Sequence, residues 1–214
     1  MEINVIIVLK NSNLYDIKYS ERVEIMEKFY YERPTINRKE EAIEYVKEYN
    51  GTLVVSGGLK NNLDNYENWL IRINDEREGK IPNVVPTENF YLIRKNDNRI
   101  VGSSNIRLKL DDNLRDIGGH IGYSIRPSER RKGYNKINLY LALKVLKEYK
   151  IDYAYLDCLD TNIGSYKTME ALGGVLIEKK EKEHNEQVDL WRKYYFDVNK
   201  CLEENKDKML QFLA

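Results

Sequence analysis

The stretch that most constrains the fold of this chain runs from Gly118 to Lys136 and reads GGHIGYSIRPSERRKGYNK. Apolar residues alternate from Ile121 to Ile125, which predicts a strand, and Pro127 must end it because proline cannot donate to a sheet ladder. A loop rich in arginine and lysine follows, and an apolar-striped helical segment begins directly after it. The first turn of a helix has unpaired N–H groups and the positive end of the helix dipole. This order of elements therefore predicts a site for a phosphate or pyrophosphate group.

The spacing Arg130-x-x-Gly133-x-Asn135 resembles the R/Q-x-x-G-x-G/A motif of the GNAT superfamily of acyl-CoA N-acyltransferases. The flanking strand and helix match as well, and the wording GGHIGYSIRPSERRKGY resembles especially a bacterial subgroup of that superfamily. The resemblance runs from about Tyr66 to Phe196. It implies an α/β fold of the α+β mixed-sheet kind, in which a strongly bent mixed sheet is flanked by helices and its central strands part to admit the cofactor. It also implies acetyl-CoA as the cosubstrate.

The resemblance places the diphosphate of CoA on the backbone N–H groups of the basic loop. The residues expected to bind acetyl-CoA there are Ile125, Arg130, Arg131, Lys132, Gly133, Tyr134, Asn135 and Lys136. The last motif position is Gly or Ala in the superfamily but Asn135 here, so this side chain either crowds the cofactor or donates a hydrogen bond to it. The alternative interpretation of the same residues is a solvated basic turn that caps a helix.

A second part of the expected cofactor site is Asn162 with Ser165. In the resembling superfamily an N-x-x-A/S pair opens the helix after the fifth strand, and the Asn side chain binds the pantetheine arm; an ordinary N-cap is compatible with this role. The superfamily often places a Tyr seven residues after that Asn, to protonate the departing thiolate, but this chain has Met169. Tyr166, one turn earlier, could substitute as the acid, or could have a core or surface role.

His120 stands near the position at which the superfamily has a general base, and an imidazole suits removal of an ammonium proton. The alternative is a structural histidine bonded inside the sheet. Asp111 and Asp112 lie in the loop before that strand, where an acidic rim would attract a cationic amine acceptor; they could equally be solvated loop residues. No metal site is expected.

Length, charge and cysteine content limit the number of domains, the possible partners and the location of the protein. A chain of 214 residues predicts a single GNAT-like domain over 1–214, with a divergent N-terminal part (1–65), a recognisable core (66–197) and a C-terminal helical tail (198–214). Its formal net charge of zero gives no attraction to nucleic acid or to anionic lipid. Two distant cysteines indicate reduced thiols, and neither a signal peptide nor a membrane span is recognisable, so we expect a cytoplasmic protein.

Periodicity predicts strands alternating with helices, next to hairpins. The expected elements are strand 3–9, helix 20–31, helix 38–49, strand 52–55, helix 66–77, strands 90–94 and 100–108, a polar loop 111–117, helix 137–149, strand 153–159, helix 162–172, a hairpin of 175–179 with 188–196, and a helical tail from 199.

Together these observations predict an N-acetyltransferase that transfers an acetyl group from acetyl-CoA to a primary amine by direct attack in a ternary complex. The acceptor stays open among small amines, antibiotics, amino acids and protein N-termini. An alternative is an acyl-CoA-binding module without activity, suggested by Asn135 and Met169. A nucleotide-binding protein is a weaker alternative, because the chain has neither G-x-x-x-x-G-K-S/T nor G-x-G-x-x-G.

Overall fold

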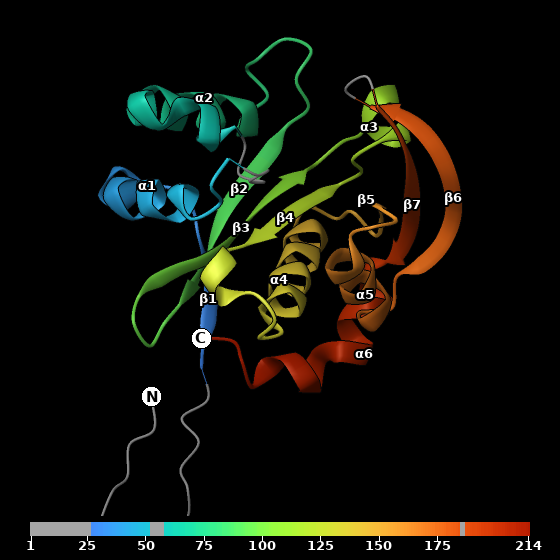
Figure 1. The fold of residues 1–214 in the computed structure, drawn as a ribbon. Helices are drawn as coiled ribbons and strands as arrows, with labels where there is room; N and C mark the ends of the chain where they lie inside the picture. Colours follow the sequence, from blue (N-terminus) through green and yellow to red (C-terminus); the bar gives the residue numbers. More distant parts are fainter. Residues whose placement is uncertain (1–26, 52–57, 185–186) are drawn as a thin grey trace, which may run out of the picture.

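The computed structural model describes residues 27–51, 58–184 and 187–214, which form a strand-rich body with helices on both sides (Figure 1). Its strands are β1 (Phe29–Glu32), β2 (Thr87–Arg94), β3 (Arg99–Arg107), β4 (Ile121–Ile125), β5 (Tyr153–Leu159), β6 (Val175–His184) and β7 (Gln187–Asp197). Its α-helices are α1 (Lys39–Lys47), α2 (Tyr66–Arg77), α3 (Asp112–Asp116), α4 (Tyr134–Glu148), α5 (Ile163–Ala171) and α6 (Val198–Leu210). The strands predicted at 3–9 and 52–55 lie outside the described residues, as does the first part of the helix predicted from Ser20.

The strands form two sheets with antiparallel ladders, in the orders β1-β2-β3-β4 and β5-β7-β6. A bridge between Gly119 and Leu156 joins them, together with a hydrogen bond of 2.7 Å from the His120 N–H to the Tyr155 carbonyl. Both links lie just before β4 begins, and the sheet divides beyond them. The predicted bent sheet with parting central strands is therefore confirmed.

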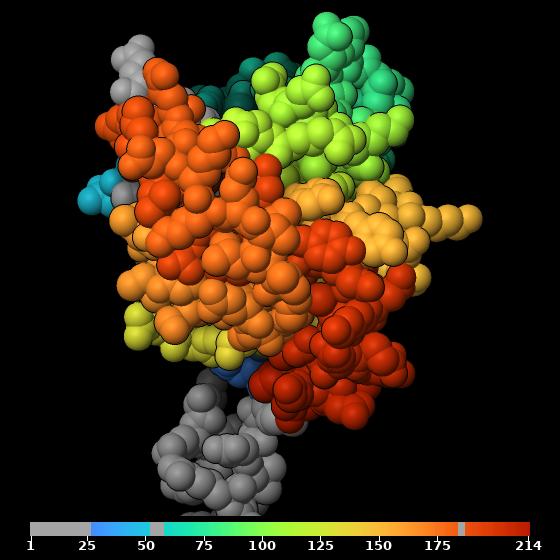
Figure 2. Space-filling model, turned by 90° about the vertical axis from the view of Figure 1, so that its right-hand side faces the viewer, coloured from blue at the N-terminus to red at the C-terminus, as the bar shows by residue number. Residues whose placement is uncertain are grey.

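Two hydrophobic clusters hold the layers together. The larger one joins α4, α5 and α6 to one face of both sheets, and the smaller one joins α1 and α2 to the opposite face of β2 and β3. Side chains alternate between the faces along a strand, so Leu92 belongs to the larger cluster while Tyr91 and Ile93 belong to the smaller one. Figure 2 shows a further face of the molecule, where the orange surface that includes β6 lies beside the red surface of α6. Among the described residues no helix has the length and apolar character needed to cross a bilayer.

The prediction of a helix over 20–31 is wrong for its last residues, because Phe29–Glu32 forms strand β1, which pairs with β2. Tyr31 explains the difference. Its ring stacks on Phe90 with 4.9 Å between centroids, and its hydroxyl bonds to the Asn138 side chain (2.7 Å). Both partners are distant in sequence. Tertiary contacts therefore decide the conformation of this segment, although its apolar spacing is typical of a helix.

The polar loop predicted at 111–117 is also wrong, because it contains the short helix α3. Asp111 caps this helix by accepting a hydrogen bond from the Leu114 N–H (2.8 Å), a common role for Asp at this position. Elsewhere the predicted helix 66–77 and strand 153–159 match α2 and β5, and α4 begins three residues earlier than predicted, at Tyr134.

The junction between the sheets depends on Gly119. Its φ is +64°, and an added Cβ would lie 2.1 Å from the Tyr155 carbonyl oxygen. We predict that Gly119→Ala lowers the free energy of unfolding by roughly 3 kcal/mol, since steric overlap and a left-handed φ both oppose it. Gly51→Ala is the control, because φ is +84° there but nothing lies within 4 Å of the new Cβ. Equal urea midpoints for the two variants would contradict this account of the junction.

Candidate functional site

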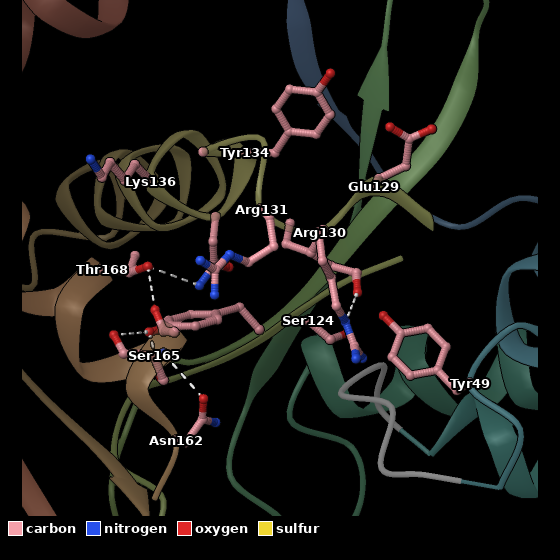
Figure 3. Close-up of a pocket in the computed structure, with 15 residues that line it drawn as sticks. Tyr49, Ser124, Glu129, Arg130, Arg131, Tyr134, Lys136, Asn162, Ser165 and Thr168 are labelled. Atoms are coloured by element: carbon pink, nitrogen blue, oxygen red, sulfur yellow. Dashed lines mark hydrogen bonds between the residues drawn. The ribbon is translucent and has the colours of Figure 1, made fainter. Parts of the chain in front are cut away.

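A cavity of about 540 Å³ opens between the end of β4, the loop that follows it and the start of α5 (Figure 3). This volume is in the range of small-molecule sites. The structure brings most of the predicted cofactor residues to this cavity: Ile125, Arg130, Arg131, Gly133, Tyr134, Asn135, Lys136, Asn162 and Ser165 line it. Lys132 does not. Their binding roles stay predictions, but the residues that the sequence analysis selected share one surface.

One edge of β4 faces the cavity with its backbone. The Arg126 N–H bonds to the Val101 carbonyl (2.9 Å), which fixes the phase of the ladder with β3. Because hydrogen-bonded pairs alternate along an antiparallel ladder, Ser124 also bonds to β3, whereas the backbone groups of Tyr123 and Ile125 point away from it. Both residues line the cavity. Their N–H groups are therefore donors directed toward a ligand.

The loop after β4 presents a row of backbone donors. Gly133 has a φ of +84° and is the N-cap of α4, and Arg131 has a φ of +67°. The bond from the Lys136 N–H to the Gly133 carbonyl (3.0 Å) closes the first turn. The N–H groups from Arg131 to Asn135 have no hydrogen-bond partner within the described chain. With the positive end of α4 beside them, they can bind an anion.

The charges around this loop are unequally paired, and the carboxylate of Glu129, which lines the cavity as well, holds part of them. Glu129, with 3% of its side chain exposed, pairs with Arg94 (2.9 Å), Arg99 (3.1 Å) and Lys132 (2.7 Å). Burial acts to raise the pKa of Glu129, but hydrogen bonds from Lys132 and Arg94 outweigh it and hold the pKa below its usual value. Lys132 is thus turned to Glu129, whereas Arg131 and Lys136 line the cavity.

Arg130 has a structural contact of its own. Its Nε donates to the Ile125 carbonyl (3.2 Å), and its guanidinium lies 5.4 Å from the centroid of the Tyr49 ring. Arg130 therefore connects the last carbonyl of β4 to Tyr49, which follows the end of α1.

The opposite wall comes from the start of α5. Asn162 caps this helix, as its side-chain oxygen accepts from the Ser165 N–H (3.2 Å). The Asn135 side chain donates to the Thr168 hydroxyl (3.3 Å), so it reaches across to α5. The Asn135 Oδ1 atom is buried without a partner. Asn135 therefore ties the start of α4 to α5 along this wall of the cavity.

His120 is not brought to the cavity. It is 8% exposed, and its Nδ1 accepts a hydrogen bond from the Tyr155 N–H (3.1 Å) between the two sheets. Burial lowers the pKa of His120 to about 4, with Arg115 and Arg107 acting in the same direction. The observed contacts are those of the structural alternative.

Tyr166 and the two acidic residues also lie outside the cavity lining. The Tyr166 ring packs under Arg192, whose guanidinium carbon is 4.0 Å from the ring centroid. Asp111 is the cap of α3, and Asp112 is exposed in the first turn of the same helix. Met169, at the position of the missing tyrosine, is buried in the core.

The sequence analysis missed several lining residues, which carry hydroxyl groups. The Tyr123 hydroxyl lies 2.8 Å from the Ser165 Oγ. Ser124 lies 2.9 Å from the Tyr45 hydroxyl, which in turn lies 2.9 Å from the Tyr49 hydroxyl. The alternation of β4 could have indicated Tyr123, since it shares a face with Ile125. Tyr49 and Ser124 meet through tertiary packing, for which no local signal exists.

Comparison with known families decides the classification. A family model described as an acetyltransferase (GNAT) domain matches residues 22–175. The chain belongs to this family. GNAT acetyltransferases use acetyl-CoA, which agrees with the predicted anion-binding loop. No curated protein sequence matches the chain.

Solved structures show the same GNAT fold. A ribosomal-protein-S5-alanine acetyltransferase from Vibrio fischeri has a TM-score of 0.64 at 14% identity, covering 81% of this chain and 94% of its own. A spermidine/spermine N-acetyltransferase from Vibrio cholerae has a TM-score of 0.59 at 14% identity, covering 83% of this chain and 98% of its own. A microcin C7 self-immunity acetyltransferase in complex with acetyl-CoA and AMP has a TM-score of 0.59 at 15% identity, covering 79% and 92%.

The lowered pKa of His120 gives this GNAT protein a pH-dependent stability. The unfolded chain takes up the proton near pH 6.5 and the folded chain only near pH 4, so stability falls as the pH drops through this window. In His120→Asn the amide oxygen can still accept from the Tyr155 N–H, but no group titrates at this position. We predict that the free energy of unfolding of this variant decreases by on the order of 2 kcal/mol less than that of wild type over this pH range. Urea unfolding at pH 7, 6, 5 and 4 measures it. Parallel curves for wild type and variant would contradict the burial of a neutral imidazole.

Proposed function

We propose that this GNAT protein is an N-acetyltransferase that transfers the acetyl group of acetyl-CoA to a primary amine by direct attack in a ternary complex. The observation that supports it most is the row of unpaired N–H groups from Arg131 to Asn135 at the mouth of the cavity. Acetyl-CoA would supply an activated thioester. The same proposal makes the protein cytoplasmic, in line with the buried free thiols Cys158 and Cys201; recovery in a membrane or secreted fraction would contradict it.

The loop residues would hold the diphosphate. Gly133 is suited to this because an added Cβ would meet nothing within 4 Å, which leaves space beside the donors for phosphate oxygens. Arg131 and Lys136 would add positive charge from the cavity wall. Lys132 would act on the loop through Glu129 instead. Asn135 leaves the donors accessible, because its side chain is bonded to Thr168 on α5.

The β4 edge would orient the thioester. The N–H groups of Tyr123 and Ile125 face the cavity, where they can donate to a carbonyl oxygen that gains negative charge during attack. Asn162 and Ser165 form the wall opposite β4, where an extended pantetheine arm would lie. Orientation and this oxyanion stabilisation can supply most of the rate, so a side-chain base is not essential.

The Tyr123–Ser165 pair would take the place of the acid that is absent at Met169. Burial raises the pKa of the Tyr123 phenol, so it stays protonated at neutral pH and can donate a hydrogen bond to the departing thiolate. We predict that Tyr123→Phe lowers kcat by roughly ten- to a hundred-fold, the size of one lost hydrogen bond to a charged group, with little change in KM for acetyl-CoA. Tyr166→Phe is the matched control and should retain wild-type kcat. Steady-state thiol release measures both, and an active Tyr123→Phe would remove the pair from the mechanism.

The second candidate function is a non-catalytic acyl-CoA-binding module. It is favoured by the positions of His120 and Tyr166 outside the cavity lining and by the burial of Met169 in the core. Incubation with acetyl-CoA and a broad panel of amines, scored by free-thiol release, separates the two functions. Binding of acetyl-CoA without release of free thiol for any amine in the panel would support the binding module and contradict the enzyme function.

The loop is tested by a matched pair of glycine variants. We predict that Gly133→Asp abolishes acetyl-CoA binding in calorimetry and thiol release, because a carboxylate would occupy the phosphate position. Gly51→Asp is the control, since Gly51 has the same φ of +84° and an equally open surrounding. Both variants should lose similar stability, but only Gly133→Asp should lose the cofactor. Unchanged affinity in Gly133→Asp would contradict the site.

A further inference from the structure

Four hydroxyl groups meet where the end of α1 packs on β3 and β4, and together they form a hydroxyl cluster of Tyr45, Tyr49, Ser103 and Ser124. The Tyr45 hydroxyl lies 2.8 Å from the Ser103 Oγ and 2.9 Å from the Ser124 Oγ. It also lies 2.9 Å from the Tyr49 hydroxyl, and the two serine Oγ atoms are 3.0 Å apart. Tyr49 and Ser124 line the cofactor cavity, where Figure 3 shows them next to each other. The cluster therefore connects the interior of the protein with one end of the cavity.

Tyr45 fixes the direction of the Ser124 side chain. A serine side chain has three staggered rotamers, and its hydroxyl proton can turn toward any nearby acceptor. The Tyr45 ring is fully buried and packs edge-on against the rings of Tyr49 and Tyr91, with centroid distances of 5.3 and 6.4 Å. A phenol held in this way offers Ser124 one fixed hydrogen-bond partner. Tyr45 thus acts on the cavity through Ser124, although it does not line the cavity itself.

Ser124 lies between the two backbone donors that face the cavity from β4. The side chains of Tyr123 and Ile125 pack in the larger hydrophobic cluster, under α4, and that core fills their face of the strand. Side chains alternate along a strand, and the Ser124 side chain accordingly points to the opposite face, toward Tyr45. An amine that attacks a carbonyl bound to the N–H groups of Tyr123 and Ile125 therefore approaches from the face on which Ser124 lies.

The hydroxyl cluster is neutral, and this decides which form of an amine it can bind. Burial raises the pKa of both Tyr45 and Tyr49, so both phenols stay protonated at neutral pH. Among the described residues that line the cavity, Glu129 supplies the carboxylate, and three cations already pair with it. A carboxylate would favour the ammonium, which cannot attack, whereas a hydroxyl oxygen can accept a hydrogen bond from a neutral amine. The cluster is therefore suited to the reactive form.

We propose that the Ser124 hydroxyl accepts a hydrogen bond from the neutral acceptor amine, and that Tyr45 is the positioning residue that orients Ser124 for this contact. The inference rests on the proposed acetyl transfer and assigns the amine-binding group of the same site. In the transfer the amine nitrogen forms the C–N bond, the C–S bond of the thioester breaks, and the proton lost by the nitrogen ends on the departing thiolate. The hydroxyl cluster orients the nitrogen and neither gains nor loses a proton.

The first test removes each hydroxyl in turn. The acceptors are ethanolamine, benzylamine, glycinamide and spermidine, and the one with the highest wild-type kcat/KM is used for the variants. Ser124→Ala and Tyr45→Phe should each lower this kcat/KM about ten-fold, the size of one hydrogen bond, while KM for acetyl-CoA stays unchanged. Ser124→Ala with wild-type kcat/KM would overturn the amine contact.

Tyr31 provides a matched control on the opposite face of the same sheet. Its hydroxyl lies 2.9 Å from the Oγ of Ser104, the neighbour of Ser103 in β3, and Tyr31 lies outside the cavity lining. Tyr31→Phe should lose about as much stability in urea unfolding as Tyr45→Phe, because each loses a buried hydroxyl, but it should keep the wild-type kcat/KM. An equal loss of kcat/KM in both variants would show a general effect on the fold and overturn the inference.

A double variant separates positioning from an independent role of Tyr45. If Tyr45 acts only through Ser124, its hydroxyl has no further effect on the reaction once the Ser124 hydroxyl is gone. Tyr45→Phe combined with Ser124→Ala should then have the same kcat/KM as Ser124→Ala alone. A loss equal to the product of the two single losses would show independent roles and overturn the assignment of Tyr45.

The proposed transfer and the amine contact can fail separately. If none of the four amines is acetylated, calorimetric titration of the CoA complex with the same amines measures the contact without turnover. Binding by wild type that is tighter at pH 9 than at pH 7, and that is weakened in Ser124→Ala, would keep the contact although the enzyme function is wrong. Absence of binding for all four amines, or binding that does not tighten with pH, would overturn the contact with a neutral amine.

Discussion

The candidate site depends on one feature of the backbone: β4 and β5 are neighbours at one end but do not form a hydrogen-bonded ladder along their length. The two strands are linked by the bridge at Gly119 and by the hydrogen bonds that Gly118 and His120 make to β5, all of them before β4 begins. Beyond these links, no strand of the described residues lies opposite the N–H groups of Tyr123 and Ile125. Backbone donors of this kind must bond to something other than the sheet, either water or a ligand. The cavity therefore arises from the course of the central strands, and the loops only complete it.

A second constraint fixes the loop before any ligand arrives. Glu129 is buried among Arg94, Arg99 and Lys132, which anchors the start of the loop to β2 and β3. Breaking such a buried pair leaves an uncompensated charge, which is strongly unfavourable. The loop amides are thus held in position at no further ordering cost when an anion binds, which is the benefit of preorganisation. The chain has a formal net charge of zero, so the positive character of the site is local.

The parts of this structure that could be predicted from the sequence are those that local residues determine. The helix 66–77 and the strand 153–159 follow from periodicity, and the anion loop follows from Pro127 and Gly133, whose backbone preferences act within a few residues. The differences between the sequence analysis and the structure have a common origin in distant partners. Tyr31 is extended because it bonds to Asn138 on α4, and His120 is held between the sheets because the Tyr155 N–H bonds to its Nδ1. Tyr49 could not be predicted as a lining residue of the cavity, because its position depends on how α1 packs on the sheet.

Two buried asparagines of this fold differ in how well their side-chain amides are hydrogen-bonded. Asn138 and Asn89 are both buried between the first sheet and a helix layer, on opposite faces. Asn138 is fully engaged, accepting from Tyr31 (2.7 Å) and Ser104 (2.9 Å) and donating to the Ser103 carbonyl (3.2 Å). Asn89 has no such bonds. A buried amide that is fully hydrogen-bonded stabilises the fold around it, whereas an unpartnered one costs its full desolvation energy. The two asparagines therefore have opposite effects on the stability of the same sheet, although both are buried against it.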